Sequence, residues 1–203
     1  MSSQQDAGEP ELHAAAIVAA LNRHQVRYVV IGAFAAIAQQ ALIPATRVID
    51  FTPEASQENL ARLSLALKEL GARVRTEGVP EGLAFSHDAT SLAAAEIWNL
   101  ICPDGEFDIS FHPSGFAGGY AQLAVNARRL RVGEVEVVVA DLADVIRSKE
   151  SAGRPKDLRV LPLLYRHQSG RQGGPGCIDP PDDLTAATVR AGKPVAPRSP
   201  PWL

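Results

Sequence analysis

Two aspartates interrupt otherwise apolar runs of the chain, and they are its clearest candidates for chemistry. Asp50 lies in the run TRVIDFT, and Asp108 lies in GEFDISF. Carboxylate oxygens are hard ligands of the kind that Mg²⁺ prefers, whereas a buried carboxylate without a partner is unfavourable. The two aspartates therefore predict either a cation site or strand ends that keep contact with water.

Residue 48 bears on this choice. Successive side chains of a strand point to opposite faces, so Val48 and Asp50 are expected to point to the same side. A metal site on this strand would favour oxygen ligands at both positions, and Val48 supplies none. Asp50 by itself also suits a solvated strand end before Thr52-Pro53. Both interpretations stay open at the level of single residues.

A cluster of charged residues, RSKESAGRPKD, lies near the end of the apolar part of the sequence. It contains Lys149, Arg154, Lys156 and Asp157. Gly153 and Pro155 predict that one helix ends and another begins within this cluster. Basic residues at a helix C-terminus complement the helix dipole. Taken by itself, the cluster suits an ordinary helix boundary at the surface.

Apolar periodicity and turn residues predict the elements that position these side chains. Ser56 is expected to cap a helix with a leucine stripe that ends at Gly71, and residues 77–94 carry few regular signals. The predicted helices cover 12–21, 33–41, 56–70, 120–127, a segment capped by Asp141, and a last segment ending at about Arg166. The predicted strands cover 26–31, 47–52, 72–76, a hairpin of 96–102 with 106–111 around Asp104-Gly105, and a hairpin of 130–139 around Gly133-Glu134.

Composition narrows the class of protein. The chain has 203 residues, 20 basic and 23 acidic residues and a net charge of −3, so no overall positive field marks a nucleic-acid binder. Two cysteines, Cys102 and Cys177, are too few for a disulfide framework, and no stretch is long enough to span a bilayer. We expect a cytoplasmic protein with a flexible N-terminus over 1–10. Residues 167–203 contain five Gly and seven Pro, which predicts a disordered tail over 168–203.

The order of these elements, with four specific segments, resembles a known family. The segments are VRYVVIGAFAA, TRVIDFTPEASQENLARLSLALKELGARVR, GEFDISF and RSKESAGRPKD. Together they resemble the small nucleotidyltransferases, specifically the AbiEii-like group that includes MenT-type toxins of type IV toxin–antitoxin pairs. The resemblance implies one α/β domain over residues 11–167, with a mixed, largely antiparallel sheet flanked by helices.

The resemblance also assigns roles to residues. It places Gly32 and Ala33 at the nucleotide phosphates, although Ala33 departs from the Gly-Ser or Gly-Gly pattern of the family. It maps an Asp-x-Asp metal motif onto positions 48 and 50, of which only Asp50 is acidic. Asp108 is implied as a metal ligand and as the base that deprotonates the attacking hydroxyl. We therefore predict that Asp50 and Asp108 face one cleft from adjacent strands of one sheet.

The remaining implied contacts are basic. Lys149 is implied to neutralise the triphosphate, and Arg154, Lys156 and Asp157 match the later motif of the family; Arg47 is a further candidate for nucleotide binding. The implied reaction is Mg²⁺-dependent transfer of a nucleoside monophosphate from an NTP to a hydroxyl, with tRNA as a possible acceptor and an antitoxin as a possible partner.

Two alternatives remain beside this reaction. A small-molecule acceptor, as in antibiotic-modifying enzymes, is one of them. The other is a non-catalytic protein that binds a nucleotide or a partner, and Val48 favours it. Glu54 is a nearby acidic residue that could replace the missing carboxylate. Arg128, Arg129 and Arg131 would support an RNA acceptor if they gather near the site.

Overall fold

The computed structural model describes residues 12–172, which belong to one compact unit. Within these residues the helices are α1 (Ala14–Arg23), α2 (Gly32–Ala38), α3 (Gln57–Glu69), α4 (Ala89–Ala93), α5 (Gly119–Leu123), α6 (Leu142–Ala152) and α7 (Pro155–Gln172). The strands are β1 (Tyr28–Ile31), β2 (Val48–Pro53), β3 (Arg73–Thr76), β4 (Val79–Leu83), β5 (Ile97–Cys102), β6 (Gly105–Ser110), β7 (Arg128–Val132) and β8 (Val135–Val139).

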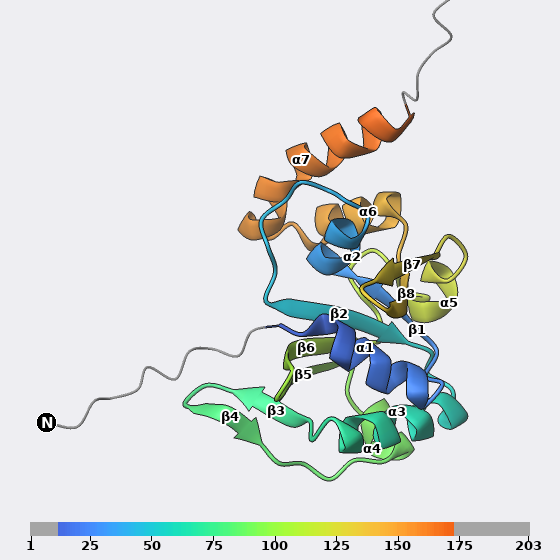
Figure 1. Cartoon of the computed structure of the whole chain (residues 1–203), viewed down its shortest axis with the longest axis vertical. Helices are drawn as coiled ribbons and strands as arrows, with labels where there is room; N and C mark the ends of the chain where they lie inside the picture. Colours follow the sequence, from blue (N-terminus) through green and yellow to red (C-terminus); the bar gives the residue numbers. More distant parts are fainter. Residues whose placement is uncertain (1–11, 173–203) are drawn as a thin grey trace, which may run out of the picture. The chain divides into compact units, whose positions relative to one another are not determined.

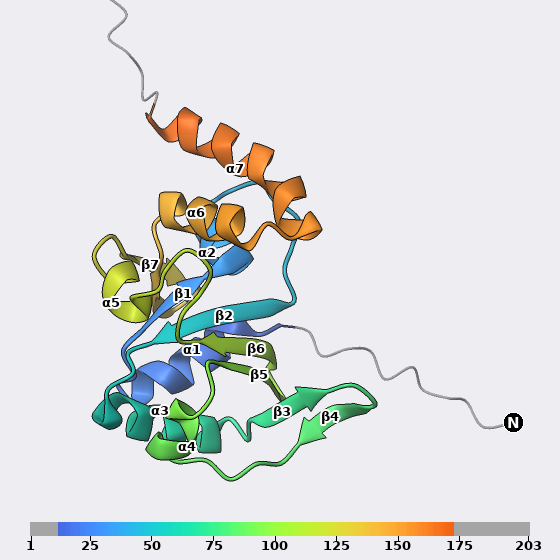
Figure 2. The same cartoon turned by 180° about the vertical axis from the view of Figure 1, so that it is seen from behind.

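The strands form a single mixed sheet in the order β4-β3-β5-β6-β2-β1-β8-β7. The β2–β6 and β1–β8 pairs are parallel and the other described pairs are antiparallel. Helices α2, α6 and α7 lie together at one end of the unit, whereas α3 and α4 lie at the other (Figures 1 and 2). The predicted α/β class, with a largely antiparallel sheet flanked by helices, is confirmed.

At the positions of the two aspartates, β2 and β6 are buried mainly on one side. On β6, Phe107 and Ile109 are buried, and Asp108 lies between them on the opposite side. On β2, Ile49 is fully buried and Asp50 again points to the other side. Since side chains of a strand alternate between faces, the apolar residues anchor the sheet in the core and place the aspartates on the opposite face, where both are half-buried.

Helix α3 follows the sequence pattern closely. The Ser56 hydroxyl accepts a hydrogen bond from the Asn59 backbone amide, and Leu60, Leu63 and Leu67 are buried along one face. Gly71 follows the helix with a φ of +60°, a conformation that glycine adopts at little steric cost.

The two predicted hairpins are both present. The hairpin of β7 and β8 turns at Gly133-Glu134 as predicted, whereas the hairpin of β5 and β6 turns one residue earlier than predicted, at Pro103-Asp104.

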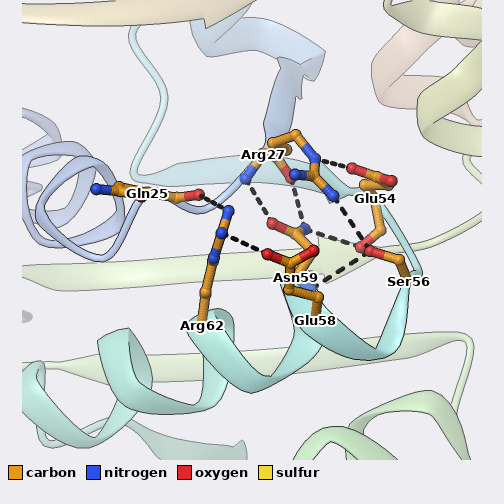
Figure 3. Close-up of polar contacts among 7 residues, drawn as sticks. All are labelled: Gln25, Arg27, Glu54, Ser56, Glu58, Asn59 and Arg62. Atoms are coloured by element: carbon orange, nitrogen blue, oxygen red, sulfur yellow. Dashed lines mark hydrogen bonds and ion pairs between the residues drawn. The ribbon is translucent and has the colours of Figure 1, made fainter.

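A polar network joins β1, β2 and α3 at the end of the strands remote from Gly32 (Figure 3). The side chain of Asn59 accepts a hydrogen bond from the Arg27 backbone amide and donates to the carbonyl oxygens of Arg27 and Glu54. The Arg27 guanidinium pairs with the Glu54 carboxylate. Glu54 therefore does not supply the carboxylate missing at Val48, and that alternative is wrong.

Two segments differ from the prediction. Residues 77–94 are not irregular, because they contain β4 and α4, and Asp88 caps α4 through a hydrogen bond with Ser91. A proline and a glycine in VPEGL hid the strand from a pattern search, but an edge strand tolerates both. Helix α7 continues to Gln172, so residues 168–172 are helical.

The N-terminal segment 1–10 and the rest of the predicted tail lie outside the described residues. Within residues 12–172, no helix combines the length and the apolar character that crossing a membrane requires.

Candidate functional site

Neighbouring strands place the two predicted aspartates side by side. Asp50 on β2 is the register partner of Asp108 on the parallel strand β6. Asp108 is in turn opposite Asn99 on β5, and Asp50 is opposite Ile31, the last residue of β1. The predicted adjacency of Asp50 and Asp108 is therefore confirmed.

Both aspartates line one open cleft of about 520 Å³. Val48 also lines the cleft, so it points to the same side as Asp50, as strand alternation predicts. The predicted residues that the cleft brings together are Gly32, Ala33, Asp50, Asp108, Lys149, Arg154, Lys156 and Asp157. Arg47 precedes β2 and is not among the lining residues, although its neighbours Thr46 and Val48 are.

The turn between β1 and α2 touches the Asp50 carboxylate. Gly32 has a φ of +75°, and a Cβ added there would lie 2.2 Å from the Asp50 Oδ2 atom. Any side chain at position 32 would therefore displace the carboxylate as well as strain the backbone. The glycine is required because the turn and the carboxylate share the same space.

The Asp50 carboxylate is poorly solvated. Its burial, together with the negative charge of Asp108, raises the pKa of Asp50 to about 6, against opposing effects of Lys149, Lys156 and Arg154. The cleft's described ion pairs involve Asp108 and Asp157, and none of them includes Asp50. Asp50 is therefore a carboxylate whose charge a bound cation would stabilise.

Asp108 is bound by an arginine that the sequence analysis did not select. Arg75 Nη2 on β3 donates to Asp108 Oδ1 at 2.8 Å, and Arg75 Nη1 pairs with Glu106. Burial raises the pKa of Asp108, although the Arg75 charge opposes the effect. The strand RVRT gave one usable signal, alternating arginines, but nothing in the sequence showed that β3 lies beside β5 and near β6.

The basic cluster is organised around Asp157. Lys149 Nζ lies 2.9 Å from Asp157 Oδ1, and Arg154 Nε lies 2.7 Å from Asp157 Oδ2. Burial by itself would raise the pKa of Asp157, but these hydrogen bonds outweigh it and hold the pKa below its usual range. Lys156 is exposed and lines the cleft. Asp157 thus orients the Lys149 and Arg154 side chains, and the cluster presents positive charge to the cleft.

The arginines of β7 do not add to this charge. Arg128 pairs with Asp141, Arg129 with Glu136 and Arg131 with Glu134. None of the three is among the residues that line the cleft within the described part of the chain. The β7 arginines therefore do not form a common cluster with Lys149, which is the arrangement that would have favoured an RNA acceptor.

The resemblance implies Mg²⁺ as the cofactor. The possible metal ligands of the cleft can therefore be compared with the ligands that Mg²⁺ requires. Among residues 12–172, no three acidic, histidine or cysteine side chains surround one point. Asp50 and the second oxygen of Asp108 are the candidate ligands that remain. Since Mg²⁺ commonly binds through one or two carboxylates plus substrate phosphates, the set fits an ion that a triphosphate helps to hold. It does not fit an ion that the protein holds alone.

Comparisons with known proteins identify no family. No family model and no curated protein matches the chain. One similar solved structure is that of TM1012 from Thermotoga maritima, described as a candidate nucleotidyltransferase, with 16% identity, a TM-score of 0.46, and coverage of 75% of this chain and 89% of that one. Another is the antibiotic-resistance factor ANT(2'')-Ia, with 14% identity, a TM-score of 0.41, and coverage of 77% and 90%. The function therefore has to be argued from the cleft itself.

Proposed function

We propose that this chain is a nucleotidyltransferase that binds an NTP in the cleft and transfers its nucleoside monophosphate to a hydroxyl acceptor. One observation carries the proposal: Asp50 and Asp108 lie side by side in a cleft that also holds Lys149, Arg154 and Lys156. Carboxylates for a metal ion beside cations for phosphate are the two halves of a phosphoryl-transfer site.

The cleft suits a nucleotide in size and charge. Its volume of about 520 Å³ is within the range of small-molecule sites. Lys149, Arg154 and Lys156 offer positive charge to the triphosphate, and Gly32 and Ala33 offer a turn that a phosphate can approach closely. In this proposal the basic cluster binds the phosphates, and the apolar wall around Ile43 and Pro44 is left for the base.

Asp50 and Asp108 would hold Mg²⁺ together with the phosphates of the substrate. Bound there, the ion would stabilise the charge that develops on the α-phosphate. Gly32 keeps space for the Asp50 carboxylate, and Arg75 fixes one oxygen of Asp108. The residues of the chain thus orient both carboxylates before substrate arrives.

The proposed transfer is a single displacement. The oxygen of the acceptor hydroxyl forms a bond to the α-phosphorus, and the bond from that phosphorus to the β-phosphate oxygen breaks. Pyrophosphate leaves with the bonding electron pair, and the hydroxyl proton passes to the Asp108 carboxylate. Lys149, Arg154 and Lys156 stabilise the charge of the departing pyrophosphate.

The acceptor hydroxyl in this reaction belongs either to an RNA or to a small molecule. The resemblance implies the 3′ end of a tRNA and a cognate antitoxin as partner, and a small molecule of the antibiotic type is the alternative. The arginines of β7 are paired with acidic residues. A tRNA would therefore have to be held near the cleft by the basic cluster around Lys149.

A second function, nucleotide binding without turnover, is favoured by two observations. Val48 occupies the cleft face where a second carboxylate would add a metal ligand, and Arg75 already occupies one oxygen of Asp108. Both features reduce the negative charge available to Mg²⁺. The protein would then keep the fold and the phosphate site while losing the transfer step.

An incubation with labelled NTPs separates these two functions. Wild type, Val48→Asp and Asp50→Asn are each incubated with α-labelled NTPs, Mg²⁺ and total tRNA, and label transfer is read on a gel. An active wild type and an inactive Asp50→Asn variant support the enzyme. If Val48 limits chemistry, Val48→Asp raises transfer on the order of a hundredfold. Transfer by wild type that Asp50→Asn leaves unchanged would contradict the assigned site.

A further inference from the structure

Among residues 12–172, Arg75 is the cation that forms an ion pair with a proposed metal ligand, Asp108. Its guanidinium bridges two carboxylates of β6, Glu106 and Asp108, and all three side chains are between 25% and 29% exposed. Bridging both acids fixes the guanidinium plane, because its N–H groups form a rigid fork. Arg75 therefore holds a defined position inside the candidate site.

The register of the sheet places Glu106 and Asp108 beside the two positions of the predicted metal motif on β2. Glu106 is the partner of Val48 across the β2–β6 ladder, just as Asp108 is the partner of Asp50. The strand neighbour of the missing carboxylate is thus itself a carboxylate. Asp50, Glu106 and Asp108 bring three negative charges to one face of two adjacent strands, and Arg75 neutralises part of that charge.

We infer that Arg75 supplies, as a fixed guanidinium, the second positive charge of this site, so that the cleft takes one divalent cation and not two. The inference rests on the proposed function and names the residue that sets its metal requirement. Asp50 and the second oxygen of Asp108 would hold this single ion. The Glu106 carboxylate remains paired with the Arg75 guanidinium and does not bind the ion.

The charge of the Arg75 guanidinium and its hydrogen bonds both act against a second ion. The guanidinium group carries a fixed positive charge that is part of the chain, whereas a bound metal ion can dissociate. A second divalent ion bound by Glu106 and Asp108 would need the oxygens that the guanidinium already bonds, and it would meet like-charge repulsion at that position. Two of its five N–H groups are used by Glu106 and Asp108, and the others remain to donate to a phosphate.

The test counts bound metal rather than activity. The full chain, with a non-hydrolysable NTP analogue, is titrated with Mn²⁺, and free Mn²⁺ is followed by electron paramagnetic resonance. Wild type is expected to bind one Mn²⁺ per chain. Arg75→Gln releases Glu106 and Asp108, so it is expected to bind a second ion at least tenfold more tightly than wild type does.

Three further variants make the result specific. Arg75→Lys keeps the charge and is expected to bind one ion. The double variant Arg75→Gln/Glu106→Gln removes the released ligand and should return to one ion. Arg73→Gln is the matched control, because Arg73 lies on the same strand and donates to the Gly82 carbonyl oxygen. It is expected to behave as wild type.

The possible failures are distinguishable. If wild type binds neither the analogue nor Mn²⁺, the proposed function itself is wrong. If wild type binds the analogue with two Mn²⁺ ions, or if Arg75→Gln still binds only one, the role of Arg75 is wrong while the proposed function stands. Circular dichroism of each variant shows whether it is folded, and a second neutral replacement, Arg75→Met, decides the question by the same ion count if Arg75→Gln is not.

Discussion

Replacement of Asp50 by asparagine should stabilise the protein more at alkaline than at acidic pH. Burial and the charge of Asp108 raise the pKa of Asp50 to about 6 in the folded protein. A raised pKa means that the folded state prefers the protonated carboxyl. The stability that this preference contributes is present at low pH and is lost as the pH rises through about 6.

The size of the effect follows from the two pKa values. The difference between the ordinary value of 3.8 and about 6 corresponds to about 3 kcal/mol over the whole titration. About 1.4 kcal/mol of this is lost between roughly pH 5 and pH 8. Asparagine does not titrate, so the advantage of Asp50→Asn over wild type should grow by that amount across the same interval.

Urea denaturation at the two pH values measures this difference. Asp157→Asn is the matched control, because Lys149 and Arg154 hold the pKa of Asp157 below its usual range. A lowered pKa contributes stability above the ordinary value of 3.8 that is lost as the pH falls. Asp157→Asn should therefore destabilise the protein near neutral pH, opposite in sign to Asp50→Asn.

One outcome would refute this reasoning. If Asp50→Asn changes the free energy of unfolding by the same amount at both pH values, the folded protein does not disfavour the Asp50 charge. The cleft would then be better solvated than its geometry indicates, and a bound cation would no longer be needed to stabilise the carboxylate.

Two further substitutions test the positions that support the site. Gly32→Ala should place a methyl group where the Asp50 carboxylate lies and abolish nucleotide binding, whereas Gly71→Ala, with φ +60° and nothing within 4 Å of its Cβ, should leave binding unchanged; binding by both variants would contradict the contact. Asn59→Ala removes three hydrogen bonds with backbone groups and should cost about 2 to 4 kcal/mol in urea denaturation. A loss below about 1 kcal/mol would show that water replaces those bonds.

Local patterns predicted most of the individual elements. The leucine stripe behind Ser56 defined α3, and the Gly133-Glu134 turn defined the β7–β8 hairpin. Such signals succeed because capping, apolar periodicity and turn residues act over a few neighbouring positions. The segment 77–94 carried weak signals of this kind, and its strand and helix were missed.

Apart from Asp50 and Asp108, which stand out as charges in apolar runs, the candidate site was predictable only through the family resemblance. Resemblance selected Asp50, Asp108 and Lys149, which line one cleft, but it could not show Arg75, which reaches Asp108 from β3. That contact depends on the strand order β3-β5-β6-β2, which joins segments distant in sequence. Arg47, a further candidate for nucleotide binding, is not among the residues that line the cleft.

The most direct test of the central claim is NTP binding by wild type and Lys156→Gln, measured by isothermal titration calorimetry with Mg²⁺. Lys156 is exposed at the cleft, so its replacement removes positive charge without disturbing the core. Arg129→Gln is the control, because Arg129 pairs with Glu136 on β8. We predict one NTP per wild-type chain and an affinity several-fold lower for Lys156→Gln alone. No binding of any NTP by wild type, or equal affinity in all three proteins, would contradict the account.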